Sequence, residues 1–383
     1  MEDAVLIDDQ LWEQLLELTD GAASACFQCG VCTATCPWGL VKDESISIRE
    51  LVRQAQIGLT DGDSDLWLCT TCAQCEIYCP RGVNIATVIR GLRYLTWQGN
   101  HPEEGLPTLL WSIYWNNNPW EQPPSQRAQW AKNIDLPRFD ADQHEILYYV
   151  GCTTSYDGRA QKIAQALVKL FQAAEVQFGI LGNDEPCSGE EALSIGHMPY
   201  FRDVAARALD TFKDNKVSQL VATSPHAFDV FSNQYPTDQH QIEPYHYTQY
   251  LSKLVEAGRL AFEKPLESVI TFQDPCYLSR YNQVLDAPRK VLNAIPGLEL
   301  VEMEKHGPET LCCGGGGGRM WIDSAAGERF ADLRVQEALD TGAKTLATAC
   351  PYCIACLEDS IKANNITNLI VADVAEIAAQ ALG

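Results

Sequence analysis

Eight cysteines of this 383-residue chain fall into two copies of one pattern near its N-terminus. Each copy has the spacing C-x2-C-x2-C-x3-C and is followed directly by proline. Three closely spaced thiolates can wrap one face of an iron–sulfur cluster, and this spacing is a ligand pattern for [4Fe-4S] clusters. Because such a pattern rarely arises twice by accident, it predicts a chain that moves electrons. The two copies are Cys26, Cys29, Cys32 and Cys36, and then Cys69, Cys72, Cys75 and Cys79.

Both runs resemble those of bacterial two-cluster ferredoxins, in which the fourth cysteine of each run ligates the other cluster. The resemblance implies two [4Fe-4S] cubane clusters with exchanged fourth ligands. One would be held by Cys26, Cys29, Cys32 and Cys79, and the other by Cys69, Cys72, Cys75 and Cys36. Zinc is an alternative, but zinc sites are typically built from paired C-x2-C knuckles, which these triple runs do not match.

Composition and charge exclude several classes of protein. The chain has 28 Lys plus Arg against 51 Asp plus Glu, a net charge of -23, so a nucleic-acid partner is disfavoured. Its N-terminus has no export signal, and its most apolar tryptophan-rich stretch, 106–115, contains Pro107 and is too short to span a bilayer. We therefore expect no transmembrane segment and a reducing location, either cytoplasmic or peripheral at the inner face of the membrane.

Residues 1–100 are predicted to form an α-helical ferredoxin domain, with helices over 46–55 and 85–96. Residues 101–144 form a structured linker rich in proline and tryptophan, in which the prolines break any long helix. For the linker tryptophans we expect interdomain packing rather than a docking surface. They are Trp111, Trp115, Trp120 and Trp130.

Two α/β domains with parallel sheets are predicted to follow, over residues 145–262 and 263–383. The first has expected strands at 146–150, 176–181 and 219–223, and the second at 268–272, 298–302 and 345–349. The spacing supports a duplication, because 35 positions separate Cys152 from Cys187 and 36 separate Cys276 from Cys312. Ligands of such sheets bind at the carboxyl ends of the strands, where these cysteines fall.

The second α/β domain resembles the cysteine-rich CCG domain of heterodisulfide reductases, and the whole chain resembles the catalytic D subunit of that family. The resemblance is carried by the segments 274–282, 312–321 and 350–353, and by Asn118-Pro119-Trp120 in the linker. It implies a noncubane [4Fe-4S] cluster at which catalysis takes place. Its five ligands would be Cys276, Cys312, Cys313, Cys350 and Cys353. The glycines at 314–318 lack the Lys-Ser or Lys-Thr of a phosphate loop, so we expect them to allow close approach of backbone to the cluster.

The first α/β domain departs from this pattern. The matching positions are Cys152, Cys187, Ser188, Ser224 and Ala227, so only two of five ligands remain and one noncubane site is expected instead of two. His226 and His246 could donate protons or bind substrate near the altered position, although packed or exposed histidines are the favoured interpretation. Cys356 is expected to be a buried bystander of the five-cysteine set.

Together these features predict an iron–sulfur oxidoreductase that passes electrons through two cubanes to a noncubane site acting on a disulfide or another two-electron substrate. One alternative is a relay between an electron-transfer flavoprotein and a membrane cytochrome b or quinone pool. A second is the iron–sulfur subunit of a glycolate or lactate dehydrogenase, and a third is a zinc-stabilised CCG scaffold. Because the chain has no flavin or nicotinamide fingerprint, we expect a flavoprotein or a membrane cytochrome b or quinone-linked subunit as its partner.

Overall fold

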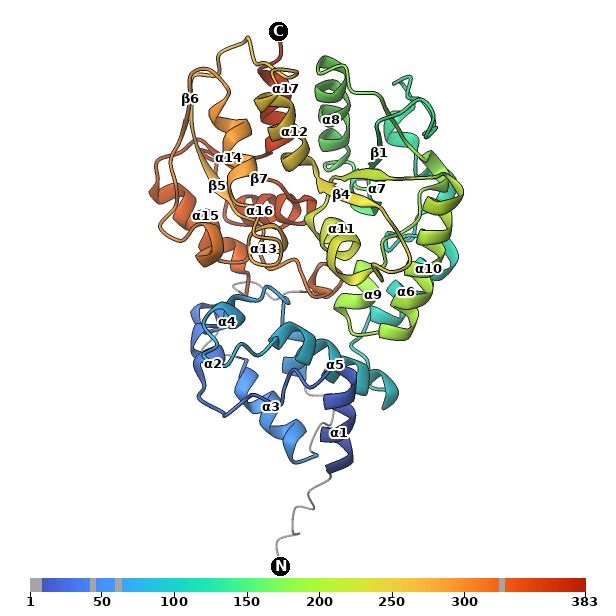
Figure 1. Ribbon diagram of the computed structural model, residues 1–383. Coiled ribbons are helices and arrows are strands. Elements are labelled where there is room, and N and C mark those ends of the chain that lie inside the picture. Colours follow the sequence, from blue (N-terminus) through green and yellow to red (C-terminus); the bar gives the residue numbers. More distant parts are fainter. Residues whose placement is uncertain (1–8, 42–45, 59–63, 324–327) are drawn as a thin grey trace, which may run out of the picture.

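The computed structural model describes residues 9–41, 46–58, 64–323 and 328–383. Its described N-terminal part is helical and lies beneath two α/β domains (Figure 1). Two of its helices begin at side-chain caps: Ser47 accepts a hydrogen bond from the amide of Glu50, and Asn84 accepts one from Thr87. The helices are α1 (Asp9–Leu18), α2 (Val31–Thr35), η1 (Pro37–Leu40), α3 (Ile48–Gln56), η2 (Ser64–Leu68), α4 (Gln74–Ile77) and α5 (Ile85–Gln98).

The linker contains an 11-residue helix, α6 (Leu106–Asn116), where an irregular chain was predicted. Pro107 is accommodated because it lies in the first turn, where its missing amide hydrogen costs no helical bond. Two short turns, η3 (Pro124–Gln126) and η4 (Gln129–Ala131), follow.

The linker tryptophans divide into two pairs. Trp120 packs edge-on against Trp321 with ring centroids 5.1 Å apart, and Trp130 is buried against Tyr148. Trp111 and Trp115 are 61% and 70% exposed on α6, so the expectation of interdomain packing is wrong for these two.

Each α/β domain is built on a four-stranded parallel sheet with helices around it, as predicted. The first sheet has the order β2-β1-β3-β4, from β1 (Ile146–Tyr149), β2 (Phe178–Gly179), β3 (Gln219–Ala222) and β4 (Glu243–His246). Its helices are α7 (Cys152–Tyr156), α8 (Gln161–Ala173), η5 (Gly182–Asp184), α9 (Glu190–Ser194), α10 (Met198–Asp214), α11 (Pro225–Asp229), η6 (Val230–Gln234) and α12 (Tyr247–Glu256).

The second sheet repeats this topology as β6-β5-β7-β8, from β5 (Ser268–Gln273), β6 (Leu298–Leu300), β7 (Thr345–Thr348) and β8 (Ile370–Asp373). Its helices are α13 (Cys276–Ser279), α14 (Asp286–Asn293), η7 (Gly307–Glu309), η8 (Arg319–Trp321), α15 (Phe330–Asp340), α16 (Pro351–Ala363) and α17 (Val374–Gln380). In both sheets the fourth strand was not predicted, because β4 and β8 are short strands that each lead directly into a helix.

The two α/β domains pack against each other through their helices. Helix α8 contacts α17 and α12 contacts α14, which pairs the first long helix of each domain with the last helix of the other. Arg159 strengthens this interface by ion pairs with Glu358 and Glu376. In each sheet the strand order reverses between the first and third strands, and this is where ligands of such folds bind.

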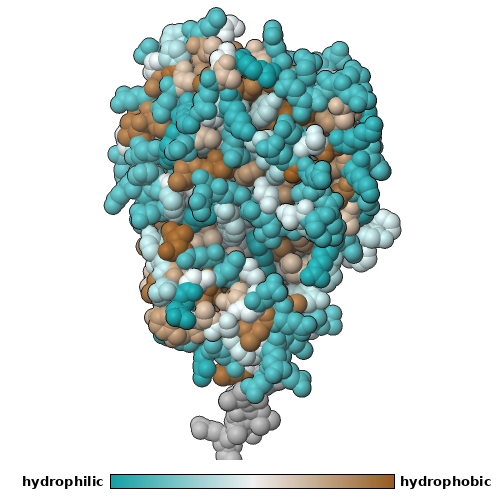
Figure 2. Space-filling view, viewed as in Figure 1, coloured by the Kyte–Doolittle hydropathy of each residue, from teal (hydrophilic) through white to brown (hydrophobic). Residues whose placement is uncertain are grey.

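The surface is mainly polar, as the net charge leads one to expect. The face shown in Figure 2 is largely hydrophilic, with small scattered hydrophobic patches. Among the described residues, no helix has the length and apolar character needed to cross a membrane.

Candidate metal centres

The eight N-terminal cysteines line two separate cavities, one for each set of four. Each cavity combines three cysteines of one run with the fourth cysteine of the other. The first is lined by Cys26, Cys29, Cys32 and Cys79, and the second by Cys36, Cys69, Cys72 and Cys75. The two cysteine runs thus have the exchanged arrangement that the ferredoxin resemblance implies.

The two cysteine loops share one backbone conformation. Gln28 and Gly30 in the first loop have φ angles of 64° and 86°, and Thr71 and Ala73 at the same places in the second have 49° and 59°. This conformation turns amide groups toward the sulfurs: the Thr71 amide donates to Cys69 Sγ at 3.4 Å. Amide hydrogen bonds to cysteine sulfur tune the potential of iron–sulfur clusters.

The five cysteines of the second α/β domain are all buried and lie together. Cys276 begins α13 directly after β5, and Cys350 caps α16 directly after β7, so both lie where the strand order reverses. The Cys313 and Cys353 sulfurs are 3.3 Å apart. Cys276 and Cys312 lie in one buried cluster, and Cys313, Cys350 and Cys353 lie in another.

One of these thiols is strongly biased toward the thiolate. Burial opposes ionisation of Cys350, but hydrogen bonds from Cys353 and His226 and the charge on His226 lower its pKa to about 5. The position of Cys350 at the N-terminus of α16 also favours the thiolate, because the helix dipole stabilises a negative charge there.

The second cysteine loop is in direct contact with the domain that carries the five-cysteine set. The side chains of Cys72, Cys276 and Cys312 lie in one buried cluster. Arg280 donates from Nε to the Cys72 carbonyl oxygen at 2.6 Å, and the Tyr281 hydroxyl donates to the carbonyl of Thr71 at 2.6 Å.

The glycine run of the second domain completes this contact. Any Cβ on Gly316 or Gly317 would lie 2.5 or 2.4 Å from the carbonyl oxygens of Thr70 and Cys69. These two glycines therefore permit close approach of the backbone to the second cysteine loop. Arg93 fixes the same region, donating to the carbonyls of Cys69 at 2.7 Å and Gly317 at 2.9 Å.

The remnant set in the first α/β domain has a different environment. Cys152 and Cys187 are hydrogen-bonded to each other, and Arg127 contacts the Cys152 sulfur at 3.5 Å. The hydrogen bond from Cys187, and then the Arg127 charge, outweigh burial and lower the pKa of Cys152 to about 7. Arg127 also forms a buried ion pair of 2.9 Å with Glu185, which ties the linker to this domain.

The two histidines named from the sequence differ in role. His246 is buried and caps α12, and burial lowers its pKa to about 3, so it is a packed structural residue. His226 is hydrogen-bonded to the Cys350 side chain, stacks on Tyr277 at 3.9 Å and has its Nδ1 3.1 Å from Oε1 of Glu190. Burial lowers the pKa of His226, but the charges of and hydrogen bonds to Glu190 and Cys350 together raise it overall.

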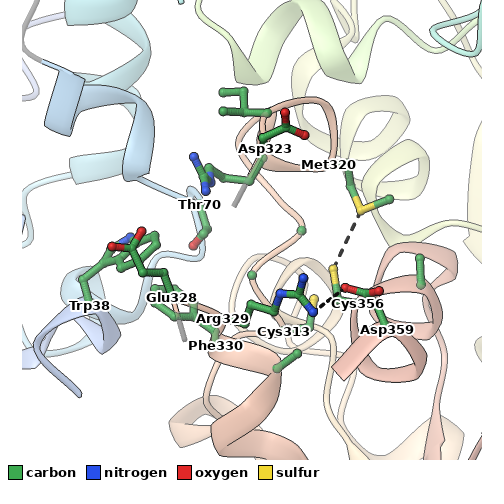
Figure 3. Close-up of a pocket in the computed structure, with 16 residues that line it drawn as sticks. Trp38, Thr70, Cys313, Met320, Asp323, Glu328, Arg329, Phe330, Cys356 and Asp359 are labelled. Atoms are coloured by element: carbon green, nitrogen blue, oxygen red, sulfur yellow. Dashed lines mark hydrogen bonds and ion pairs between the residues drawn. The ribbon is translucent and has the colours of Figure 1, made fainter. Parts of the chain in front are cut away.

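A pocket of about 360 Å³ reaches the five-cysteine set at Cys313. Cys313 and Cys356 lie at its base, and Trp38 and Thr70 of the N-terminal part form its opposite wall (Figure 3). Cys356 is partly exposed there, with its sulfur 3.7 Å from that of Met320, so it is not the buried bystander that was expected. The sequence gives no signal for this pocket, because its walls come from distant segments.

The cysteine sets fit iron–sulfur clusters better than single metal ions. Each of the three sets gathers four or five thiols around one position, with hydrogen-bond donors directed at several sulfurs. Among the described residues, no group of three or more His, Cys, Asp or Glu side chains has the geometry of a single-ion site.

Comparison with known families agrees with this arrangement of domains. A family model described as a cysteine-rich domain matches residues 146–227 and 270–358. A second family model, described as a 4Fe-4S dicluster domain, matches residues 22–83. A hypothetical protein from Helicobacter pylori has a similar structure, with a TM-score of 0.54, 13% identity and coverage of 98% of this chain and 73% of that one. That likeness concerns the fold alone.

Three relatives illustrate the sequence similarity. The chain is 37% identical to the probable iron-sulfur-binding oxidoreductase FadF of Bacillus subtilis, over 85% of this chain and 48% of that protein. It is 30% identical to EtfAB:quinone oxidoreductase of Syntrophomonas wolfei, over 97% and 59%. It is 28% identical to the D subunit of the dihydromethanophenazine:CoB--CoM heterodisulfide reductase of Methanosarcina barkeri, over 97% and 95%. The chain thus spans about half to three fifths of the first two relatives.

The fold and the family matches define an iron–sulfur protein with one dicluster domain and two cysteine-rich domains. Within that class, the chain belongs to the iron–sulfur oxidoreductases that are similar to the D subunit of heterodisulfide reductase.

Proposed function

We propose that the chain is an electron-transfer subunit in which three cysteine sets act in series. The two N-terminal sets would each hold a [4Fe-4S] cubane, and the five cysteines of the second α/β domain would hold a noncubane [4Fe-4S] cluster. When bound, these clusters supply one-electron redox steps. The observation that carries the proposal is the contact between Cys72 and Cys312, which joins the second set to the five-cysteine set.

The residues around this contact have defined tasks in the proposal. Arg280 and Tyr281 hold the second cysteine loop in place, and Arg93 fixes it to the glycine run. Burial of the five cysteines keeps water away from them. The pocket at Cys313 has a volume within the usual range for small ligands, and would admit a disulfide or another two-electron substrate.

A relay role is the second candidate, and the similarity to a protein named EtfAB:quinone oxidoreductase favours it. In that case electrons would come from an electron-transfer flavoprotein and leave to a quinone-linked or cytochrome b membrane subunit, with the chain cytoplasmic or at the membrane's inner face. The altered first domain is compatible with this role, because it keeps two of the five ligand positions used in the second. No further observation favours a glycolate or lactate dehydrogenase subunit.

Stopped-flow reduction tests the proposal and separates its two forms. Anaerobically purified chain is mixed with a reduced electron-transfer flavoprotein, and a quinone or a small disulfide is then added. We expect the cluster absorbance to bleach and then to recover with one of the two acceptors. Recovery with the disulfide supports the substrate-reducing form, and recovery with the quinone supports the relay. Failure of both reduction and reoxidation would contradict the proposal.

A further inference from the structure

The first α/β domain keeps the loop geometry of the five-cysteine motif. Gly189 and Gly314 both have left-handed φ angles, of 79° and 96°. Each donates its amide to the cysteine sulfur two residues earlier, at 3.4 Å to Cys187 and 3.3 Å to Cys312. The loops therefore correspond residue by residue, but the two positions after this glycine differ in chemistry. They are Glu190 and Glu191 in the first domain, and Gly315 and Gly316 in the second.

Glu191 is placed as a carboxyl group with one oxygen to spare. It is buried, with 6% of its surface exposed, and its Oε1 accepts a hydrogen bond of 2.6 Å from the Tyr352 hydroxyl. Its other oxygen, Oε2, is buried without a hydrogen-bond partner among the described residues. Glu191 lines a cavity of about 20 Å³, which is enough for one water molecule.

The surroundings of Glu191 favour its neutral form. Burial is the largest cause, and the negative charge of Glu190 adds to it, so the pKa of Glu191 is raised to about 8. Burial opposes ionisation of Glu190, but the His226 charge, hydrogen bonds with His226 and Ser194, and the Arg90 charge together lower its pKa. The titratable side chains around Glu191 and its cavity are Tyr149, Cys152, Cys187, Glu190, His226 and Tyr352.

The cavity beside Glu191 is connected to the five-cysteine set through the side chain of Tyr352. Tyr352, the partner of Glu191, lies between Cys350 and Cys353 on α16. His226 lines the cavity and is also hydrogen-bonded to Cys350. Charges at such separations interact appreciably where water is largely excluded, so a charge added at the five cysteines raises the proton affinity of Glu191.

We propose that Glu191 is the redox-linked proton site of the five-cysteine centre. Above about pH 8, Glu191 is ionised while the centre is oxidised. A cluster held there that gained one electron from the second cysteine set would then draw one proton onto the Glu191 carboxylate, giving a carboxylic acid, with the proton supplied from solvent through water in the cavity. When the electron leaves, the proton returns to the water. The altered first domain thus holds a proton at the position where the second domain has a glycine. This inference rests on the proposed function, which supplies the centre.

Redox titration of the full chain across pH 6 to 10, followed by electron paramagnetic resonance, tests the inference. We expect the midpoint potential of the third centre to fall with pH above about 8 in the wild type, where Glu191 is ionised in the oxidised state. Glu191→Gln retains an oxygen for the Tyr352 hydroxyl but cannot titrate, so it should flatten this dependence. Glu191→Asp should keep it, and so should Glu256→Gln, which alters an exposed carboxylate paired with Lys290.

The outcomes separate this inference from the proposed function. A third-centre signal whose potential depends on pH equally in wild type and Glu191→Gln would overturn the inference alone. A pH-independent potential in the wild type would do the same. If the wild type shows no third-centre signal, both the proposed function and this inference fail. Infrared difference spectra between the oxidised and reduced states add a second readout, since a carboxylic-acid band should be present in wild type and absent from Glu191→Gln.

Discussion

The Cys72 side chain lies in one buried cluster with that of Cys312, although 240 positions separate them in the sequence. Cys72 belongs to the second N-terminal cysteine set and Cys312 to the five-cysteine set of the last domain. The proximity of Cys312, together with burial, raises the pKa of Cys72 well above its usual value. The two sets are in direct side-chain contact, so an electron could pass between them over a short distance.

Removal of the Arg280 side chain should weaken this junction. In Arg280→Ala the carbonyls of Cys72 and Thr310 lose hydrogen bonds of 2.6 and 2.7 Å. Hydrogen bonds to charged groups are worth about 1.5–3 kcal/mol each, so we expect a loss of about 3 kcal/mol or more in the free energy of unfolding. The magnetic interaction between the second and third centres, measured by electron paramagnetic resonance, should weaken as well.

A matched control is Arg159→Ala, which removes ion pairs between the two α/β domains and leaves the second cysteine loop untouched. It should lower stability without changing the magnetic interaction. Equal changes in this interaction in both variants would show that Arg280 acts only on overall stability.

Exchange of the fourth ligands predicts a crossed effect of two substitutions. Because Cys79 lines the cavity of Cys26, Cys29 and Cys32, Cys79→Ser should damage the first cubane and spare the second. Cys36→Ser should damage the second and spare the first. The two spectra distinguish the cubanes, and loss of the second cubane in Cys79→Ser would refute the exchange.

The sequence predicted the parallel sheets because buried strands alternate with helices at regular spacing, and each cysteine follows the end of a strand. It missed β4 and β8, since both are four-residue strands that run directly into α12 and α17. It also missed α6, because Pro107 was interpreted as a break although it lies in the first turn of that helix. Proline is tolerated in the first turn of a helix, so Pro107 does not prevent α6 from forming.

Asp373 allows a test of the pH dependence of stability. It is fully buried at the start of α17, with the Tyr247 hydroxyl donating to it at 2.6 Å, and burial raises its pKa to about 8. In the unfolded chain its pKa returns to about 3.9, so the folded state binds one more proton between these values. The stability contribution is therefore present below about pH 4 and is lost as pH rises to about 8.

Asp373→Asn replaces the titratable carboxyl group by an amide and still provides a residue that can cap α17. Urea denaturation at pH 5, 6, 7 and 8 should show wild-type stability falling relative to the variant, by up to about 1.4 kcal/mol per pH unit. A constant difference between the two proteins across this range would contradict the raised pKa.

Much of the candidate site was visible in the sequence, because ligand cysteines are recognised by type and spacing. The glutamates of the first domain were not, since Glu190 and Glu191 gain their significance from contacts with His226 and Tyr352 that only the packed domains bring about. For the same reason, spacing alone gave no sign that Gly316 and Gly317 receive the second cysteine loop.

The central claim is that the second α/β domain holds a four-iron centre and the first does not. Cys313 is one of the five cysteines proposed as ligands there, whereas Cys187 belongs to the altered set beside Arg127 and Glu185. Cys187→Ala is therefore the matched control for Cys313→Ala, because both substitutions remove a buried cysteine from the duplicated motif. Cys187 corresponds to Cys312, the residue that directly precedes Cys313.

Iron, sulfide and zinc analysis of the anaerobically purified wild type and these two variants is the most direct measurement. We predict about 12 iron per chain in the wild type, about 8 in Cys313→Ala with both cubanes still reducible, and about 12 in Cys187→Ala, because each cluster contains four iron atoms. About 8 iron with one zinc in the wild type, or equal iron loss in both variants, would contradict the account.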